Sequence, residues 1–374
     1  MSNIEIKEVK SKSDLNKFIS FVDKLYKGNK YKVPQLHSFE KSTLNKDKNP
    51  AFDFCEAKYW LAYKDGKIVG RIAGIINHKS NETWKEKNIR FGWIDFIDDI
   101  EVSKALLKAV EDWGKENNLE AVHGPLGFTD MDLEGMLVED FDELSTQAAI
   151  YNYPYYPKHM EKLGYVKDTD WFHYKINVPK QIPDKVKRVT DLVLKKYNLR
   201  ILDAKKPKDI LPYAKKMFNT LNEAYGHLYG YVALTDKQIE KYTKDYFSMI
   251  DTRYVCFVLD KDDDVVAFGV SVLSLSKALQ KAKGKLFPFG FIHILKALKK
   301  NDTVDLLLQA VKPSYKKKGV AAVFYSKLIQ AYIDTGVKTA ITGHILEDNK
   351  SSFQMFEAYD SKQFLRRRVY IKNI

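Results

Sequence analysis

Two pairs of apolar runs, each folded around a short polar turn, stand out along the chain. In the first pair, residues 59–63 and 68–76 flank a turn that contains Asp65-Gly66. In the second pair, residues 253–259 and 265–273 flank an acidic turn at 261–264. An Asp-Gly turn between apolar runs is a strong hairpin signal. The pattern therefore predicts one β-hairpin in each half of the chain.

Each predicted hairpin lies in the same series of elements. A strand and amphipathic helical segments precede it, and a strand, a helix, a short strand, a helix and a final strand follow. In the first half these elements are predicted at 4–9, 13–25, 90–97, 102–117, 120–124, 156–162 and 172–178, with a further strand at 146–151. In the second half they are predicted at 199–203, 210–225, 236–249, 304–311, 316–336, 339–343, 351–359 and 365–371, with an inserted segment at 276–300.

The repeat predicts two domains, residues 1–180 and 199–374. Pro179 and Pro183 mark the segment between them, 181–198, which is predicted to be a linker and connecting helix. At 374 residues the chain is long enough for each domain to bury its own core.

In the second half, an apolar strand runs into a basic turn that contains a glycine. The first N–H groups of a helix lack partners inside the helix, and the helix dipole adds positive potential. A basic turn at a helix start therefore predicts an anion site, although a triple lysine is also typical of a solvated face. The glycine patterns of mononucleotide and dinucleotide sites do not occur here. The predicted site comprises Lys316, Lys317, Lys318, Gly319, Val320 and Ala321.

The two halves differ at this position. When residues 121–124 are aligned with residues 340–343, the basic turn falls opposite residues 97–102, which carry Asp98, Asp99 and Glu101. Carboxylates would repel a phosphate instead of binding it. The second half is therefore expected to bind the anion, and the first to have a structural or substrate-selecting role.

Composition narrows the class of protein. The net charge of +13 favours anionic partners such as a nucleotide-like cofactor, RNA or an acidic membrane surface. The lysines are dispersed and RNA-binding aromatic motifs are absent, so nucleic acid is the weaker expectation. Cys55 and Cys256 form neither a disulfide framework nor a metal-binding pattern, and no metal is expected. No membrane-spanning run and no secretory signal are recognised, so a cytoplasmic location is the default expectation.

The spacing Lys316-x-x-Gly319-x-Ala321 resembles the pyrophosphate pattern of the GNAT acetyltransferase superfamily, with lysine where glutamine or arginine is more usual. Residues 346–349 and 160–165 also fit that superfamily, as does the order of elements in both halves. The chain thus resembles two GNAT domains in tandem. The resemblance implies an α/β, layered α+β fold, in which each domain has a mixed, mainly antiparallel sheet flanked by helices.

The resemblance also implies transfer of an acyl group from acetyl-CoA, or another acyl-CoA, to a small-molecule or peptide amine. The turn would hold the pyrophosphate, and strand amides before it would face the acyl carbonyl and the pantetheine arm. Asn349 would touch that arm, or would only cap the following helix. Besides the residues of the turn, the implied cofactor-binding residues are Gln309, Ala310, Val311 and Asn349.

Candidate proton-transfer groups are Glu347, His344 and Tyr359. The usual acid tyrosine of the superfamily is replaced by Phe356, which cannot donate a proton. An aromatic loop that would form the substrate wall contains Tyr225, His227, Tyr229 and Tyr231. Docking of this loop on the other domain is the alternative. The acidic loop at 129–143 is expected either to attract a cationic amine or to be a solvated loop.

Two other functions remain open from the sequence. Fem-type transferases use aminoacyl-tRNA on two GNAT-like domains, and the basic charge and tandem layout favour that alternative. A non-catalytic acyl-CoA sensor or scaffold is suggested by Phe356. The sequence predicts neither the acyl length nor the oligomeric state.

Overall fold

The computed structural model describes residues 4–247, 250–349, 353 and 359–374. The strands are β1 (Ile4–Glu8), β2 (Cys55–Lys64), β3 (Lys67–Asn77), β4 (Asn88–Phe96), β5 (Ala121–Gly124), β6 (Met136–Leu137), β7 (Val166–Asn177), β8 (Arg200–Ile201), β9 (Val255–Leu259), β10 (Val265–Leu273), β11 (Thr303–Val311), β12 (Thr339–Ile341), β13 (Ile345–Leu346) and β14 (Ser361–Asn373). The α-helices are α1 (Lys12–Leu25), α2 (His37–Thr43), α3 (His78–Trp84), α4 (Ile100–Glu116), α5 (Tyr155–Lys162), α6 (Asp184–Lys196), α7 (Pro207–Ile210), α8 (Ala214–Tyr225), α9 (Asp236–Tyr246), α10 (Ser276–Ala282), α11 (Gly290–Lys299) and α12 (Val320–Thr335). Short 3₁₀ turns are η1 (Pro50–Asp53), η2 (Leu211–Tyr213), η4 (Thr252–Tyr254) and η5 (Pro313–Tyr315).

The strands form one 14-stranded sheet with the order β1-β2-β3-β4-β5-β14-β7-β12-β11-β10-β9-β8, to which β6 and β13 add at the centre. Both predicted hairpins are present, as β2–β3 and β9–β10. Within the described residues only β4–β5 and β11–β12 pair in parallel. The predicted layered fold with mixed, mainly antiparallel pairing is therefore confirmed.

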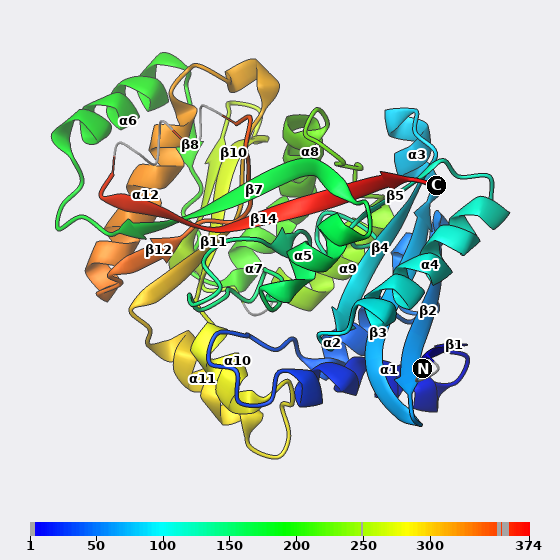
Figure 1. Cartoon of the computed structure of the whole chain (residues 1–374). Helices are drawn as coiled ribbons and strands as arrows, with labels where there is room; N and C mark the ends of the chain where they lie inside the picture. The colour runs from blue at the N-terminus through cyan, green and yellow to red at the C-terminus, as the bar shows by residue number, and fades with distance from the viewer. Residues whose placement is uncertain (1–3, 248–249, 350–352, 354–358) are drawn as a thin grey trace.

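The last strand of each half pairs with the other half. Strand β7, from the first half, pairs with β12, whereas β14, at the end of the chain, pairs with β5. β7 and β14 also pair with each other, and Figure 1 shows them side by side across the middle of the molecule. The sheet therefore continues without a break through the predicted boundary. The division into 1–180, 181–198 and 199–374 stays a prediction, and α6 lies within its connecting segment.

One long helix covers the sheet in each half. Leu106 of α4 and Leu328 of α12 lie in the two cores. Each helix passes close to a strand glycine: a β-carbon at Gly70 would lie 2.7 Å from Leu106 Cδ1, and one at Gly269 would lie 2.8 Å from Leu328 Cδ1. A larger residue at either glycine would push the helix away, so the two halves share this packing constraint.

The strand predicted at 146–151 is wrong. Side chains at its two ends satisfy local backbone groups instead: Ser145 Oγ donates to Ala149 O at 3.3 Å, and Asn152 Nδ2 donates to Tyr153 O at 3.2 Å. Side chains that bond nearby backbone in this way favour turns over a strand ladder. None of the described helices is long and apolar enough to cross a membrane.

A buried carboxylate joins the two exchanged strands. Asp170 of β7 is fully buried and accepts hydrogen bonds from Arg366 Nε at 2.7 Å and Arg368 Nε at 2.8 Å, both on β14. Burial alone would raise the pKa of Asp170, but the bonds from Arg368 and Arg366 hold it below its usual value. The ionised carboxylate thus stabilises the seam between the halves.

We expect Asp170→Ala to lower the free energy of unfolding by about 3 kcal/mol, because two half-buried guanidinium groups lose this buried partner. Hydrogen exchange should show lost protection on both sides of the seam, in β5 and in β12. The matched control is Asp112→Ala, which removes an exposed pair with Lys108 and should cost less than about 1 kcal/mol.

The lowered pKa of Asp170 makes the stability of the fold depend on pH. Because its folded pKa is lowered, its stabilising effect is present above the unfolded pKa, near 4, and is lost as the pH falls through the folded value. Chemical denaturation between pH 7 and pH 3 should therefore bring wild type and Asp170→Ala closer together. A constant difference across that range would contradict the assignment.

Candidate functional site

The edge of β11 opens in the second half. β11 pairs with β12 only at Thr303, Val304 and Asp305, although it continues to Val311 along β10. The pairing ends at Asp305, although the chain after β12 stays close at first: a β-carbon at Gly343 would lie 3.2 Å from Leu306 O. The end of β11 thus has backbone groups that β12 does not use.

Successive residues of β11 direct their backbone N–H and C=O groups to opposite sides of the strand, so every second residue faces this opening. Lys312 N donates to Val266 O at 2.8 Å, so Lys312 and Ala310 direct their backbone groups toward β10. Gln309 and Val311 direct theirs to the other side, where the Tyr225 hydroxyl donates to Gln309 O at 2.8 Å. Of the three strand amides that the sequence predicts, those of Gln309 and Val311 lie on the open side.

The basic turn leads into α12 as predicted. Gly319 precedes the helix with φ of +76°, a left-handed conformation that glycine adopts readily, and none of the described side chains caps the helix start. A β-carbon at Gly319 would lie 3.3 Å from Val193 Cγ2 of α6, which covers one side of the turn. Val320 and Ala321 begin the helix, so their N–H groups belong to the uncapped end.

The three lysines of the turn make no ion pair within the described residues. Lys316 Nζ lies 3.3 Å from His227 Nε2, and Lys318 Nζ lies over the rings of Tyr315 and Tyr197. Cationic side chains beside uncapped N–H groups are the donor set that a phosphate requires.

The first half lacks this arrangement. Asp99 caps α4 with its own carboxylate, which accepts from Glu101 N at 3.0 Å and pairs with Lys64 Nζ at 2.7 Å. A second anion at this helix start would meet a negative charge. The predicted contrast between the halves therefore has a structural basis.

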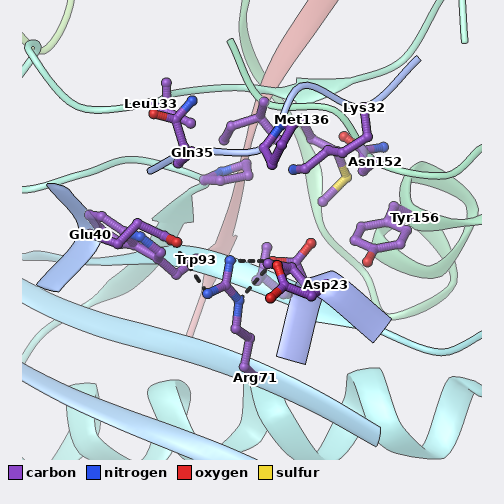
Figure 2. A pocket seen from close by; sticks show the side chains of 16 residues that line it. Asp23, Lys32, Gln35, Glu40, Arg71, Trp93, Leu133, Met136, Asn152 and Tyr156 are labelled. Carbon is purple, nitrogen blue, oxygen red and sulfur yellow. Dashed lines mark hydrogen bonds and ion pairs between the residues drawn. The ribbon is translucent and has the colours of Figure 1, made fainter. Parts of the chain in front are cut away.

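The equivalent opening beside β4 contains internal ion pairs. β4 pairs with β5 only over Asn88–Arg90, and Figure 2 shows the cavity next to its free end. There Arg71 Nε donates to Asp95 Oδ2 at 2.9 Å, and Arg71 Nη1 lies 3.5 Å from Glu40 Oε1. The charges that line this cavity largely satisfy one another.

His344 follows Gly343 at the opening of β11. Its ring centroid lies 4.8 Å from that of His173 and 5.9 Å from that of Trp171. Burial, reinforced by the charge of Arg367, lowers the pKa of His344 to about 3. The imidazole is therefore neutral at pH 7, and its buried Nε2 has no hydrogen-bond partner in the described part of the chain.

Two neighbours of His344 were missed from the sequence. His173 is fully buried, donates from Nδ1 to Thr342 O at 2.8 Å, and leaves Nε2 without a partner among the described residues. Arg367 is also fully buried, and its Nη2 is likewise unpartnered there. Both residues lie in the exchanged strands, where no local motif marks them. Only strand pairing between the halves brings them to His344.

The other predicted proton-transfer groups differ in their surroundings. Glu347 accepts hydrogen bonds from Lys167 Nζ at 2.6 Å and from Asp170 N at 3.2 Å, so β7 holds its carboxylate. Tyr359 is half-buried against the second core, and burial raises its pKa. Asn349 O accepts from Phe353 N at 3.3 Å, and Phe356 lies outside the described residues.

The aromatic loop docks on the first half, as in the alternative. Tyr229 donates a hydrogen bond to Asp168, and Tyr231 O accepts from Trp84 Nε1 at 3.1 Å. Burial raises the pKa of Tyr225, the first residue of the loop, to about 12. The loop therefore bridges β11, the basic turn and the first half, and its substrate role stays a prediction.

The acidic loop meets the aromatic loop from the other side. Asp130 Oδ2 accepts from Val232 N at 3.3 Å, and burial raises the pKa of Asp130 and of Asp132 to about 6. Glu134 is buried with a raised pKa, and a β-carbon at its neighbour Gly135 would lie 3.1 Å from Trp171 Cε3. The expectation of a solvated loop is therefore wrong for Glu134, whereas Asp130 and Asp132 are partly exposed.

Two bacterial proteins are similar in sequence to this chain along nearly its whole length. No protein-family model matches the chain. It is 28% identical over 373 residues to Protein YghO of Escherichia coli K12, covering 97% of this chain and 94% of that protein. It is 24% identical over 384 residues to the bacterial ceramide synthase of Caulobacter vibrioides, covering 99% and 98%.

Among solved structures, a tandem GNAT protein from the clavulanic acid biosynthesis pathway superposes with a TM-score of 0.57 at 9% identity. The match covers 99% of this chain and 98% of that one. At this identity the likeness concerns the fold. The chain therefore has the tandem GNAT fold that its sequence resembles.

Proposed function

We propose that the chain is an acyltransferase that moves an acyl group from acyl-CoA to an amine and binds the acyl-CoA in its C-terminal half. The observation that carries this proposal is the start of α12. It combines an uncapped helix end, a left-handed glycine and three lysines beside the open edge of β11. The first half offers an acid-capped helix at the same position instead.

The donors present at α12 suit a diphosphate. The N–H groups of Val320 and Ala321 and the cations of Lys316 and Lys318 would hold it, and Gly319 lets the backbone approach closely. The open backbone of Gln309 and Val311 would then lie along the arm that leads from it. Acyl-CoA supplies a thioester, an acyl group activated for attack by an amine. Acetyl-CoA is the smallest form of this substrate.

The pKa values favour Asp130 as the proton acceptor. A general base works best when its pKa lies near the working pH, and Asp130, at about 6, is closer to neutrality than His344, at about 3. Asp130 also lies near the open strand edge, since its charge acts on Tyr225, whose hydroxyl donates to Gln309 O at 2.8 Å. In this proposal His344 is a neutral polar group at the open strand edge, and the first half supplies the base.

The Caulobacter relative suggests one class of acceptor. Its name states that it makes ceramide, the amide of a long-chain amino alcohol and a fatty acid. We therefore include a long-chain amino alcohol, with long-chain acyl-CoA, among the acceptors to test beside small and peptide amines.

The cofactor site is tested by calorimetry with acetyl-CoA. Gly319→Glu should weaken binding at least tenfold, about 1.4 kcal/mol, because it adds a negative charge and a strained side chain at the phosphate position. Gly336→Glu is the matched control, since Gly336 has φ of +74° at the other end of α12 with open space around it. It should bind as wild type does. Absence of binding by the wild type, or equal losses in both variants, would refute the site.

The base is tested by the rate of amide formation at several pH values. Wild-type kcat should fall as the pH drops below about 6, because Asp130 becomes protonated, and Asp130→Asn should lower kcat roughly a hundredfold at pH 7.5.

Asp132→Asn provides the control for Asp130. Asp132 has the same raised pKa, but its carboxylate accepts hydrogen bonds from Phe128 N and Thr129 N within its own loop. This variant should change kcat less than threefold. If both asparagine variants lose activity equally, the loop has a structural role and Asp130 is not the base. If His344→Gln instead lowers kcat strongly and Asp130→Asn leaves kcat unchanged, His344 is the proton acceptor.

A further inference from the structure

The inserted segment 276–300, here named the lysine–aromatic hairpin, is both strongly basic and strongly apolar. It contains seven lysines and no aspartate or glutamate. It forms α10 and α11, seen in yellow at the lower edge of Figure 1. This segment takes no part in the proposed acyl transfer, so its role must be argued separately.

The hairpin is firmly attached through α10. Ala278, Leu279 and Ala282 of that helix are buried. Gln280 Nε2 donates to Lys30 O at 2.8 Å, and His37 N donates to Gly284 O at 2.9 Å. The first half thus holds the base of the hairpin, and α11 is displayed on the outside.

The apolar side chains of α11 and the turn before it are exposed to water. Phe287 is 79% exposed, Phe289 69% and Leu295 54%. Phe291 and Ile292 are each more than a third exposed, and Gly290 is the buried residue of the helix. Large apolar side chains clustered on a surface in this way mark a docking site and not an ordinary solvated helix.

The lysines decide which partner fits. Lys281, Lys283 and Lys285 precede the aromatic turn, and Lys296 and Lys299 lie toward the end of α11. A symmetric contact with a second copy of the chain would bring two such lysine sets together, and they would repel each other. A surface that offers an apolar interior beneath a layer of negative charge satisfies both the aromatic side chains and the lysines.

We propose that the lysine–aromatic hairpin docks on an anionic lipid bilayer. α11 would lie in the plane of the interface, with Phe287, Phe289 and Leu295 among the acyl chains and the flanking lysines at the phosphate level. α11 has 10 residues, about half of what a membrane-spanning helix needs, so it would lie on the bilayer and would not cross it. The proposal does not depend on acyl transfer, because it rests on this surface alone.

The test is co-sedimentation of the full chain with vesicles of phosphatidylcholine alone and with vesicles containing 30% phosphatidylglycerol, at about 0.1 M salt. The wild type should bind the anionic vesicles at least tenfold more tightly than the neutral ones, and added salt should weaken this binding. Phe287→Ser/Phe289→Ser/Leu295→Ser should lower binding at least tenfold. The three side chains are exposed, so thermal unfolding should be unchanged.

Matched variants separate the hairpin from general effects. Val166→Ser/Leu192→Ser/Leu211→Ser removes exposed apolar side chains elsewhere and should bind as the wild type does. Lys281→Glu/Lys296→Glu/Lys299→Glu should abolish the preference for anionic lipid, whereas Lys104→Glu/Lys115→Glu/Lys195→Glu, with the same change in net charge, should largely keep it.

Three outcomes would overturn the proposal. One is the absence of wild-type binding to anionic vesicles. Another is equal loss in the hairpin and control variants, which would mean that overall charge drives adsorption. The third is wild-type self-association, measured by analytical ultracentrifugation, that the triple serine variant abolishes. That result would assign the surface to a contact between copies of this chain.

Discussion

The pairing of β7 with β14 is the interaction on which the rest of the structure depends. Each half gives its last strand to the other, so neither half completes its sheet from its own residues. Asp170 fixes the register of this pairing by binding guanidinium groups on both Arg366 and Arg368. A buried carboxylate with two such partners is costly to break, and the two halves therefore behave as one cooperative unit.

The exchange also explains where the polar groups meet. β7 carries His173 and β14 carries Arg367, and their pairing places both beside His344 in the second half. The same seam brings the acidic loop of the first half under the aromatic loop of the second. In the proposed reaction, a base from one half and an anion-binding helix from the other would act together. In the first half, the Arg71 ion pairs occupy the corresponding strand opening, which gives the proposed division of roles a physical basis.

Much of the fold could be predicted because it depends on interactions between residues that are close together in the sequence. The Asp65-Gly66 turn and the apolar runs beside it determine the first hairpin without help from distant residues. The prediction at 146–151 failed because Ser145 and Asn152 bond the nearby backbone, which the hydrophobic alternation of a strand does not reveal. In the site, the uncapped start of α12 and its glycine could be recognised because helix ends follow local rules. The raised pKa of Asp130 and the occupied carboxylate of Glu347 could not, because both depend on residues distant in the chain.

The sequence by itself determined the element order, the repeat and the difference between a lysine-rich and a carboxylate-rich helix start, since each depends on residues close together in the chain. The tertiary structure alone decided that β7 and β14 exchange, that His173 and Arg367 join His344, and that α11 exposes its aromatic side chains. These features depend on which surfaces pack against which. A run of apolar residues predicts burial, and only the packing of α10 against the first half shows that α11 is left in contact with water.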